Sequence, residues 1–324
     1  MSTIPAQSWG QAVRAIETAG QISLACHISP DGDALGSMLA FAHGLRHLDR
    51  RFTVSFGEPY GVPAMLAFLP GLEMLSEPSL YPAAPDVMIT FDAARRDRLG
   101  GLAPAAERAR ELIVLDHHVS NPGFGTIDLV DHDAAATAVV TDQLLTRLGV
   151  PLTKDSATCL YAGLASDTGS FKYAMTTPAV HALAGRLIEA GAKPDEVSRE
   201  LWDRSSFGLL KVLGIALERA VLDEAAIGGL GLVSTTVSRA DRLGVGYDRL
   251  EGIIDVLRRA DEAEVAVVAK ENDEGRWYVS TRSKGAVDVG RACEALGGGG
   301  HRLAAAFTAD GDVQALINRL KELL

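Results

Sequence analysis

Short apolar runs alternate with amphipathic segments through the first half of the chain. Five runs have the nearly continuous apolar character of strands that are covered on both faces, at residues 22–27, 52–56, 87–92, 112–116 and 127–130. Helical patterns lie between most of these runs, most clearly at residues 35–48. Strands that alternate with helices indicate an α/β domain with a mostly parallel sheet.

Three of the apolar runs end in a polar residue that is common in active sites. These residues are His27, Asp92 and Asp116. In an open α/β sheet, binding sites form outside the carboxyl ends of the strands. We therefore expect the three side chains to point into the same crevice.

The rest of the chain predicts more helices and then a second, smaller domain. Helices are expected at residues 134–148, 155–165 and 178–190, and the second of them leads into Asp167. A strand at 230–237, a helix at 247–260, a hairpin of 265–270 with 277–282 and a helix at 287–296 form a new α/β cycle. The predicted boundaries are a first domain at 1–190, a linker helix at 191–215 and a second domain at 216–324.

The overall charge restricts the class of ligand. The chain has 324 residues and a formal net charge of -11. Proteins that hold long nucleic acids are usually basic, because neutralising phosphates supplies most of the affinity. The acidic net charge argues against long duplex nucleic acid as a partner. It is compatible with a small phosphorylated substrate, because bound divalent cations would make the local electrostatic potential positive.

The cysteines and the amino terminus bear on the compartment. Cys26, Cys159 and Cys293 are far apart and odd in number, which is typical of a reducing environment. The first 20 residues have no basic segment followed by an apolar run, and no stretch approaches the roughly 20 apolar residues of a membrane span. We expect a cytoplasmic protein without a signal peptide or a membrane partner.

The segment from His27 to Asp33 is the first candidate for a metal site. A histidine and two carboxylates, Asp31 and Asp33, follow a strand on a loop that contains Pro30 and Gly32. Burying these groups without partners would be costly, and a divalent cation would remove that cost. The alternative is a solvated turn in which Asp31 caps the next helix. Taken alone, the segment fits both interpretations.

Further acids and histidines strengthen the metal hypothesis when they are considered together. Taken singly, Asp92 and Asp167 are interpreted as helix caps. An aspartate followed by two histidines at the end of a strand, as in Asp116-His117-His118, is uncommon for residues that only face solvent. Adjacent side chains diverge, so at most one histidine should join Asp31 and Asp33, which leaves the other free to face a substrate. Mixed imidazole and carboxylate ligands suit Mn²⁺ better than Mg²⁺. Two such ions would generate a nucleophile and clamp a phosphoryl oxygen.

Two segments of the second domain are candidates for holding an anion. A glycine run places backbone N–H groups against an anion, and Gly297 to Gly300 is followed by His301. Arg282 supplies a guanidinium suited to bidentate phosphate binding, next to Ser283. The alternatives are a plain flexible loop and an exposed charge at the end of a strand.

These segments together resemble the DHH/DHHA1 phosphoesterase superfamily, and within it the group of bacterial nanoRNases and 3′-phosphoadenosine-5′-phosphate phosphatases. That group includes phosphodiesterases of cyclic di-AMP and its linear product. The resemblance covers the chain almost from end to end. The matching segments are His27 to Ser37, Asp92-Ala93, Asp116-His117-His118, Asp167 to Phe171, Arg282-Ser283 and Gly297 to His301.

The resemblance implies a fold and a role for each of these residues. It implies a DHH domain, a DHHA1 domain and an active site in the cleft between them. One Mn²⁺ would be held by His27, Asp31 and Asp92, and a second by Asp33, Asp92, His117 and Asp167, with Mg²⁺ or Co²⁺ as substitutes. Asp116 would orient a ligand histidine, and His118 would face the scissile phosphate. The substrate would be gripped by Arg282, Ser283, Gly298, Gly299, Gly300 and His301.

The implied activity is hydrolysis of short oligoribonucleotides or linear dinucleotides, with phosphoadenosine phosphate and cyclic di-AMP as further candidate substrates. A family II inorganic pyrophosphatase is the alternative enzyme, and a receptor that binds a cyclic dinucleotide without turnover is the alternative of another class. The resemblance also suggests a homodimer. Two residues depart from the family pattern: Ala93 takes the place of a hydroxyl residue, and Ala306 takes the place of a glycine.

Overall fold

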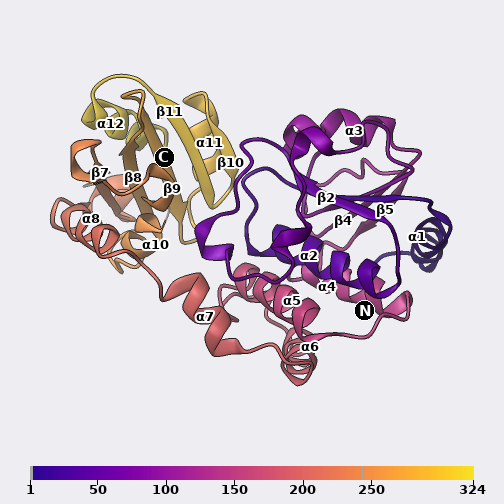
Figure 1. The fold of residues 1–324 in the computed structure, drawn as a ribbon. Helices are drawn as coiled ribbons and strands as arrows, with labels where there is room; N and C mark the ends of the chain where they lie inside the picture. Colours follow the sequence, from indigo (N-terminus) through magenta and orange to yellow (C-terminus); the bar gives the residue numbers. More distant parts are fainter. Residues whose placement is uncertain (1–2, 243, 251) are drawn as a thin grey trace. The chain divides into compact units, whose positions relative to one another are not determined.

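The computed structural model describes residues 3–242, 244–250 and 252–324. The chain divides into two compact units, unit 1 (Met1–Arg204) and unit 2 (Ser205–Leu324). The division falls within residues 191–215, the predicted linker. In that segment helix α7 (Pro194–Trp202) belongs to unit 1 and helix α8, which starts at Phe207, belongs to unit 2 (Figure 1).

Unit 1 contains a five-stranded sheet in which every strand pair is parallel. The strand order is β2-β1-β3-β4-β5. The chain thus places β2 on one side of β1 and the later strands on the other side, so the strand order reverses between β1 and β3. The strands are β1 (Ile22–Cys26), β2 (Phe52–Phe56), β3 (Val87–Phe91), β4 (Glu111–Asp116) and β5 (Ile127–Val130). The predicted α/β class with a parallel sheet is confirmed. All residues of β1 and β3 are buried, which explains their continuous apolar runs.

Helices cover the sheet of unit 1 on both faces (Figure 1). Besides α7 they are α1 (Ala6–Thr18), α2 (Gly32–His47), α3 (Ala103–Arg108), α4 (Thr137–Arg147), α5 (Lys154–Asp167) and α6 (Pro178–Glu189), with 3-10 turns at Ala64–Leu66, Leu72–Met74, Pro78–Leu80 and Arg96–Leu102. Helix α2 begins three residues before the start predicted from the apolar pattern. Its first turn carries the polar segment at Asp31 and Asp33, which an apolar pattern does not reveal.

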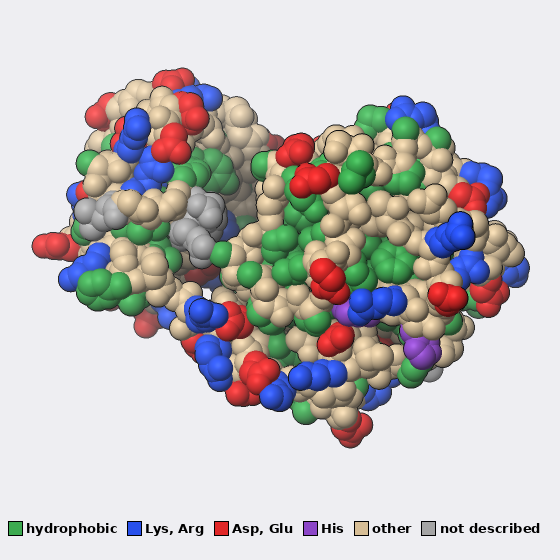
Figure 2. Space-filling view, in the orientation of Figure 1, with side chains coloured by type: hydrophobic (Ala, Val, Ile, Leu, Met, Phe, Trp, Pro, Cys, Tyr) green, Lys and Arg blue, Asp and Glu red, His purple; other side chains and the backbone are tan. Residues whose placement is uncertain are grey.

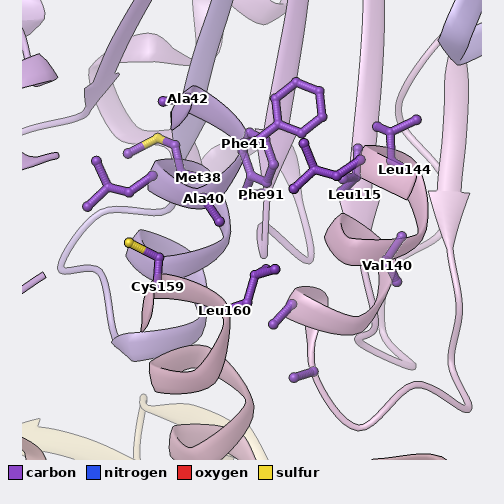
Figure 3. Close-up of a cluster of buried hydrophobic side chains, with 14 of the residues drawn as sticks. Met38, Ala40, Phe41, Ala42, Phe91, Leu115, Val140, Leu144, Cys159 and Leu160 are labelled. Carbon is purple, nitrogen blue, oxygen red and sulfur yellow. The ribbon is translucent and has the colours of Figure 1, made fainter. Parts of the chain in front are cut away.

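Close packing of α2 on α5 and the sheet forms the core of unit 1. Phe41 of α2 lies against Phe91 of β3, with ring centroids 5.6 Å apart, and Cys159 and Leu160 of α5 line the other side of the cluster (Figure 3). Gly36 lies where the two helices meet, because a Cβ added there would clash with the backbone carbonyl oxygen of Cys159. This contact brings the amino terminus of α2 to the carboxyl-terminal half of α5.

Unit 2 is built on a mixed six-stranded sheet of order β10-β11-β9-β8-β7-β6. Its strands are β6 (Val221–Asp223), β7 (Leu232–Val237), β8 (Val265–Glu271), β9 (Trp277–Ser283), β10 (Gly299–His301) and β11 (Ala304–Ala309). Strands β7 and β8 are parallel and the other pairs are antiparallel. The predicted smaller α/β domain and its hairpin are therefore confirmed.

The helices of unit 2 pack on this sheet as two separate apolar clusters. They are α8 (Phe207–Glu218), α9 (Ala226–Gly229), α10 (Ile253–Leu257), α11 (Val289–Ala295) and α12 (Val313–Leu323). Helices α8 and α10 share one cluster, and α11 and α12 share the other. The helix predicted at 247–260 includes residue 251, which lies outside the described residues. On either side of it the structure has a 3-10 turn at Tyr247–Leu250 and the short helix α10.

The surface is mixed in charge. Acidic and basic side chains are interspersed over both units on the face that Figure 2 shows. Among the described residues, none of the helices has the length and apolar character needed to span a membrane.

Candidate metal centre

The topology of unit 1 places polar residues of neighbouring strands side by side. Cys26, Phe91 and Leu115 are register partners at the ends of β1, β3 and β4. The next residue along each of these strands is His27, Asp92 or Asp116, so the three predicted residues lie in one row at the carboxyl edge of the sheet. The row includes the β1/β3 reversal, where open α/β sheets form their sites.

Helix α2 adds two carboxylates to this edge. Asp31 caps the helix through one carboxylate oxygen, Oδ1, which accepts hydrogen bonds from the backbone N–H groups of Asp33 and Ala34 at 3.1 and 3.0 Å. Its other oxygen, Oδ2, lies 3.8 Å from His27 Nε2. The capping interpretation and the ligand interpretation of Asp31 therefore apply to different oxygen atoms and are compatible.

Two groups of potential ligand atoms lie at this edge. Within each group the atoms are no more than 4.8 Å apart, and the groups are His27, Asp31 and Asp92, and Asp33, His117 and Asp167. Asp92, His117 and His118 form a third, overlapping group. All six residues predicted as metal ligands are thus present in these groups.

Asp92 stands between the two ligand groups. Its Oδ2 lies 3.6 Å from His27 Nε2, and its Oδ1 lies 3.6 Å from His117 Nε2. The residue has a positive φ of 57° and is only 3% exposed. Left-handed backbone is uncommon for residues other than glycine, although aspartate and asparagine tolerate it, and it is concentrated at functional sites. The turn at Asp92 directs one carboxylate oxygen toward each group.

Asp33 is buried and held by three donors. The backbone N–H groups of Thr137 and Ala138, at the start of α4, donate to its Oδ2 and Oδ1 at 2.5 and 2.9 Å, and Ser37 Oγ donates to Oδ1 at 3.1 Å. A carboxylate at a helix amino terminus is favoured by the helix dipole. Asp33 therefore joins α2 to α4 while it faces His117 and Asp167.

The crowding of like charges perturbs the acid–base equilibria of the site. Burial lowers the pKa of His27, but Asp31 and Asp92 outweigh it and raise the value to about 10. Burial also lowers the pKa of His117, but the neighbouring carboxylates outweigh this effect and raise the pKa to about 10. These carboxylates are Asp167, Asp33 and Asp92. Burial and the neighbouring Asp92 raise the pKa of Asp167 to about 6. Protons on these groups thus offset part of the negative charge of the site.

The donor set fits divalent cations. Nε2 of His117 is buried and lies 3.0 Å from Asp167 Oδ2, yet it makes no hydrogen bond with any residue that the structure describes. A buried ring nitrogen that forms no hydrogen bond is unfavourable unless it binds a cation or, when protonated, pairs with a neighbouring carboxylate. Two imidazoles with four carboxylates offer the mixed nitrogen and oxygen ligands that first-row divalent ions bind. Binding such ions would displace the protons described above.

Asp116 interacts with His118 rather than with the ring of His117. Its Oδ1 accepts from His118 Nδ1 at 2.7 Å and from the backbone N–H of His117 at 2.8 Å. Asn121, a residue that the sequence analysis did not select, donates from Nδ2 to Asp116 Oδ2 at 2.6 Å. Burial raises the pKa of Asp116, but His118 and Asn121 outweigh it and hold the pKa below its usual value. His118 is thus oriented by an ionised carboxylate that other hydrogen bonds hold in place.

Thr137 is a second residue that the sequence analysis missed. It is fully buried, and its Oγ1 donates to Asp92 Oδ1 at 2.8 Å, while its backbone N–H donates to Asp33. Ala93, the residue after Asp92, is buried in an apolar cluster and has no hydroxyl group. The hydroxyl contact to this site therefore comes from the start of α4. Nothing in the apolar periodicity of α4 indicates this contact.

Replacement of Thr137 by valine tests this contact. The Thr137→Val variant keeps the side-chain volume and the backbone donor to Asp33 but removes the hydrogen bond to Asp92. We expect kcat/KM for phosphoester hydrolysis to fall about 10- to 100-fold, as when other outer partners of metal ligands are removed. The measurement is steady-state hydrolysis with saturating Mn²⁺.

Thr141 provides a matched control one turn further along α4. Its hydroxyl is also buried, but it has no hydrogen-bond partner among the described residues. Thr141→Val should therefore retain wild-type activity and equal or higher stability, because an unpaired buried hydroxyl is replaced by a methyl group. Equal activities of the two valine variants would show that the Thr137 hydroxyl does not support the site.

In unit 2, Arg282 and His301 flank a small residue. Arg282 of β9 is the register partner of Ala304 in β11, which in turn is the partner of His301 in β10. Directly paired residues of antiparallel strands project from the same face of a sheet. The neighbouring row on that face, Ser280, Ala306 and Gly299, is also small. The two basic side chains are therefore separated by a patch of small residues on this face of the sheet, which we call the small-residue patch.

Other predicted substrate-binding residues have structural partners in unit 2. Ser283 Oγ donates to Glu264 Oε1 at 2.7 Å. The backbone N–H of Gly298 donates to the carbonyl oxygen of Cys293 and ends α11. Gly300 has a φ of 143°, and a Cβ there would clash with Ala305. The glycine run thus serves a helix end and a close strand pair. Nearby, His301 is exposed, and Arg282 is half-buried and donates one hydrogen bond to the carbonyl oxygen of Thr281.

Comparison with known proteins agrees with this division of the chain. Residues 21–164 match the model of the DHH family, N-terminal domain, and residues 232–324 match that of the DHHA1 domain. A solved structure of an exopolyphosphatase-related protein from Bacteroides fragilis has a TM-score of 0.91 and 21% identity, and the match covers 100% of this chain and 97% of that chain. That likeness shows a shared fold.

Two curated relatives carry the same name, bifunctional oligoribonuclease and PAP phosphatase NrnA. The protein of Thermus thermophilus is 33% identical over 318 residues, which cover 96% of this chain and 91% of the relative. The protein of Bacillus subtilis is 26% identical, and the match covers 90% of each chain. The chain belongs to the DHH phosphoesterase superfamily, in the group of these NrnA relatives, and is a metal-dependent hydrolytic phosphoesterase.

Proposed function

We propose that this protein uses two Mn²⁺ ions to hydrolyse short oligoribonucleotides and linear dinucleotides, and that it also removes a phosphate from phosphoadenosine phosphate. The position of Asp92 carries the proposal. Its two carboxylate oxygens each lie 3.6 Å from a histidine of a different ligand group. A carboxylate that faces two separate ligand groups is the arrangement that a two-ion centre requires.

Six residues would hold the ions. His27, Asp31 and Asp92 would bind the first, and Asp33, Asp92, His117 and Asp167 the second. Bound there, divalent ions supply the acidity that generates hydroxide from water at neutral pH and the charge that stabilises phosphoryl oxygens. The tight backbone and side-chain hydrogen bonds of Asp33 and Asp92 hold these carboxylates in place before a substrate arrives, so that little reorganisation is needed during the reaction.

His118 would contact the substrate at the scissile phosphate. Its Nδ1 is committed to Asp116, so Nε2 is the ring nitrogen that remains for a phosphoryl oxygen. The side chain is 30% exposed, more than that of His117. The hydrogen bonds from Asn121 and the His117 backbone fix Asp116 and, through it, the orientation of the imidazole. His118 would therefore stabilise charge that develops on the substrate.

Unit 2 would bind the part of the substrate that does not react. Arg282 and His301 offer a guanidinium and an imidazole on one face of the sheet, and a guanidinium can bind a phosphate through two parallel hydrogen bonds. Because the side chains of the small-residue patch between them are short, a nucleotide would fit over it. Ala306, where the family pattern has a glycine, is part of that patch. A long strand is disfavoured as substrate by the net charge of -11.

The names of the relatives support the substrate class. Both curated relatives are named for oligoribonuclease and PAP phosphatase activities, and the first shares 33% of its residues with this chain. Cyclic di-AMP has the same phosphodiester chemistry without a free terminal phosphate. We therefore rank it below the linear dinucleotide, because Arg282 and His301 would lack a terminal phosphate to bind.

A side-by-side assay with Mn²⁺ tests the proposal. The substrates are phosphoadenosine phosphate, diadenylate, cyclic di-AMP and pyrophosphate. We expect hydrolysis of the first two, slower hydrolysis of cyclic di-AMP and little of pyrophosphate, with loss of all activity after thorough chelation and recovery when Mn²⁺ is added back. Pyrophosphate as the preferred substrate would favour an inorganic pyrophosphatase. Binding of cyclic di-AMP without any product would indicate a receptor.

A further inference from the structure

The loop that follows Asp167 has an unusual backbone. Gly169, Ser170 and Phe171 follow one another with φ values of 57°, 60° and 64°. Residues other than glycine rarely adopt left-handed backbone, and then as single residues, because Cβ comes too close to the following carbonyl oxygen. Strained backbone of this kind is concentrated at active sites and ligand clamps. The run begins two residues after a predicted metal ligand, so we expect it to position a group that serves the site.

Hydrogen bonds and ring contacts hold the loop in this conformation. The backbone N–H of Phe171 donates to Thr168 Oγ1 at 3.0 Å, and the backbone N–H of Tyr173 donates to the carbonyl oxygen of Thr168 at 3.1 Å. The ring of Phe171 contacts the rings of Tyr161 in α5 and His181 in α6, with centroid distances of 5.8 and 5.4 Å. The loop is therefore fixed to both helices, and its remaining side chains extend from an ordered backbone.

Tyr173 lies across Gly169 with one face of its ring. A Cβ added at Gly169 would clash with Cζ, Cε1 and Cε2 of Tyr173. These three ring carbons are nearer to that position than the hydroxyl oxygen is, so the glycine meets the plane of the ring and not its end. Tyr173 is 45% exposed, and within the described part of the chain no other ring or cation stacks on it. The second face of the ring is therefore open.

This open aromatic face lies next to the candidate metal centre. Gly169 follows Asp167 by two residues, so their Cα atoms are at most about 7.6 Å apart. Asp167 Oδ2 lies 3.0 Å from His117 Nε2 in the second ligand group. A nucleobase is joined through one ribose to the phosphate that reacts, so it reaches the side chains that surround the ions. Stacking on an aromatic ring is a common way to hold a base without reading its sequence.

We propose that Tyr173 is a stacking platform for the base of the nucleotide whose phosphate reacts. The inference rests on the proposed function and adds a base subsite to it. Gly169 lets the ring lie flat against the backbone, and the left-handed run fixes it there before a substrate binds, which lowers the entropic cost of binding.

A base subsite of this kind fits both proposed substrate classes. Short oligoribonucleotides and phosphoadenosine phosphate each carry a nucleoside next to the scissile phosphate, whereas pyrophosphate has no base. Every base has a π face, so the subsite accepts purines and pyrimidines, and it favours purines because their larger rings stack more strongly. Tyr173 would therefore contribute to the selection of nucleotides over simple phosphate esters.

Hydrolysis of matched substrates with Mn²⁺ tests the subsite. Tyr173→Leu should lower kcat/KM on diadenylate about 5- to 100-fold, because it removes the stacking surface. The loss should appear mainly in KM, since stacking holds the ground state and the transition state equally. On a dinucleotide analogue that lacks both bases, the variant and the wild type should be equal to within about 2-fold, because the contact that distinguishes them is then absent from both.

Two further variants separate the ring from the fold. Tyr173→Phe keeps the aromatic face and should stay within about 3-fold of the wild type on diadenylate. Trp202→Leu is the control, because Trp202 is an aromatic residue of unit 1 with a similar exposed fraction, 42%, but it ends α7 and is not beside Asp167. Its replacement should leave kcat/KM unchanged.

The fluorescence of 2-aminopurine gives a readout that does not depend on turnover. The probes are diadenylate analogues with a methylenephosphonate linkage and 2-aminopurine in place of one adenine or the other. They are bound with Mg²⁺, because paramagnetic Mn²⁺ itself quenches fluorescence. Stacking quenches this base, so at least one saturated probe should be quenched by the wild type and by Tyr173→Phe, and much less by Tyr173→Leu.

The outcomes distinguish the subsite from the proposed function. An equal loss of activity by Tyr173→Leu on the substrates with and without bases, wild-type activity of that variant on diadenylate, or equal quenching by the variant and the wild type would each overturn the base subsite. A wild type that hydrolyses none of the substrates would refute the proposed function instead, and the quenching would still decide whether Tyr173 binds a base.

Discussion

Replacement of Asp92 by asparagine is expected to abolish phosphoester hydrolysis. An amide has no charge and only one oxygen, so it cannot present an anionic oxygen to both His27 and His117. Removing a single electrostatic stabiliser often costs 10²- to 10³-fold, and a residue shared by two ions should cost more, so we expect kcat/KM to fall by at least about 10³-fold, or about 4 kcal/mol. Asparagine tolerates the positive φ of 57° at this position, which alanine does not.

The readouts for Asp92→Asn are kcat/KM on phosphoadenosine phosphate and the number of Mn²⁺ ions bound per chain. The wild type should bind two ions in the site, and the variant should bind fewer. Asp86→Asn is the control, because Asp86 stands just before the same strand at its opposite end and makes an exposed ion pair with Arg110. Wild-type activity together with two bound ions in Asp92→Asn would refute the bridging role.

Replacement of Gly36 by alanine should both destabilise unit 1 and disturb its metal centre. The added Cβ would clash with the carbonyl oxygen of Cys159 and lie 3.4 Å from the backbone nitrogen of Gly163, and neither atom belongs to a side chain that can turn away. Helices α2 and α5 would have to separate. Overpacking of this kind costs about 3 kcal/mol, and in a domain of this size that lowers Tm by about 6 to 12 °C.

The same separation would move Asp33 away from Asp167. The two residues lie on α2 and α5, and a Cβ at Gly163 would already be 2.8 Å from Asp33 Oδ1. Mn²⁺ affinity should therefore fall together with Tm. Gly185→Ala is the control, because Gly185 is within α6 and a Cβ there would meet no heavy atom within 4 Å in the part of the chain that the structure describes. That variant should be about 0.5 to 1 kcal/mol more stable. A Gly36→Ala protein with the Tm and Mn²⁺ affinity of the wild type would contradict the close crossing.

The strands of unit 1 were predictable because each is covered on both faces. Residues of β1, β3 and β4 are almost all buried, so their apolar runs are nearly continuous and the carboxyl end of each is marked by an aspartate or a histidine. Those end residues are His27, Asp92 and Asp116. Since parallel strands end at one edge of a sheet, the pattern also predicted which residues would meet.

The pattern was less informative in unit 2. The glycines after α11 indicated an anion loop from their sequence alone, but the N–H of Gly298 is used to end the helix, and the contact with Ala305 explains Gly300. Ser283 beside Arg282 also has a partner, because Glu264 from the start of the hairpin reaches its hydroxyl group. Hydrogen bonds between residues about 20 positions apart leave no mark in a local pattern.

By itself, the sequence determined the two α/β units, the carboxyl-edge position of the candidate site and the residue types that fit divalent cations, because periodicity and strand ends are local properties. Only the tertiary structure decided which partners these residues have. The glycine crossing of α2 and α5 brings Asp33 to Asp167, the start of α4 supplies the Thr137 hydroxyl to Asp92, and Asp116 is shared between His118 and Asn121. Each of these contacts depends on backbone approach and side-chain direction between elements distant in the chain, or across a turn, which no spacing of residue types specifies.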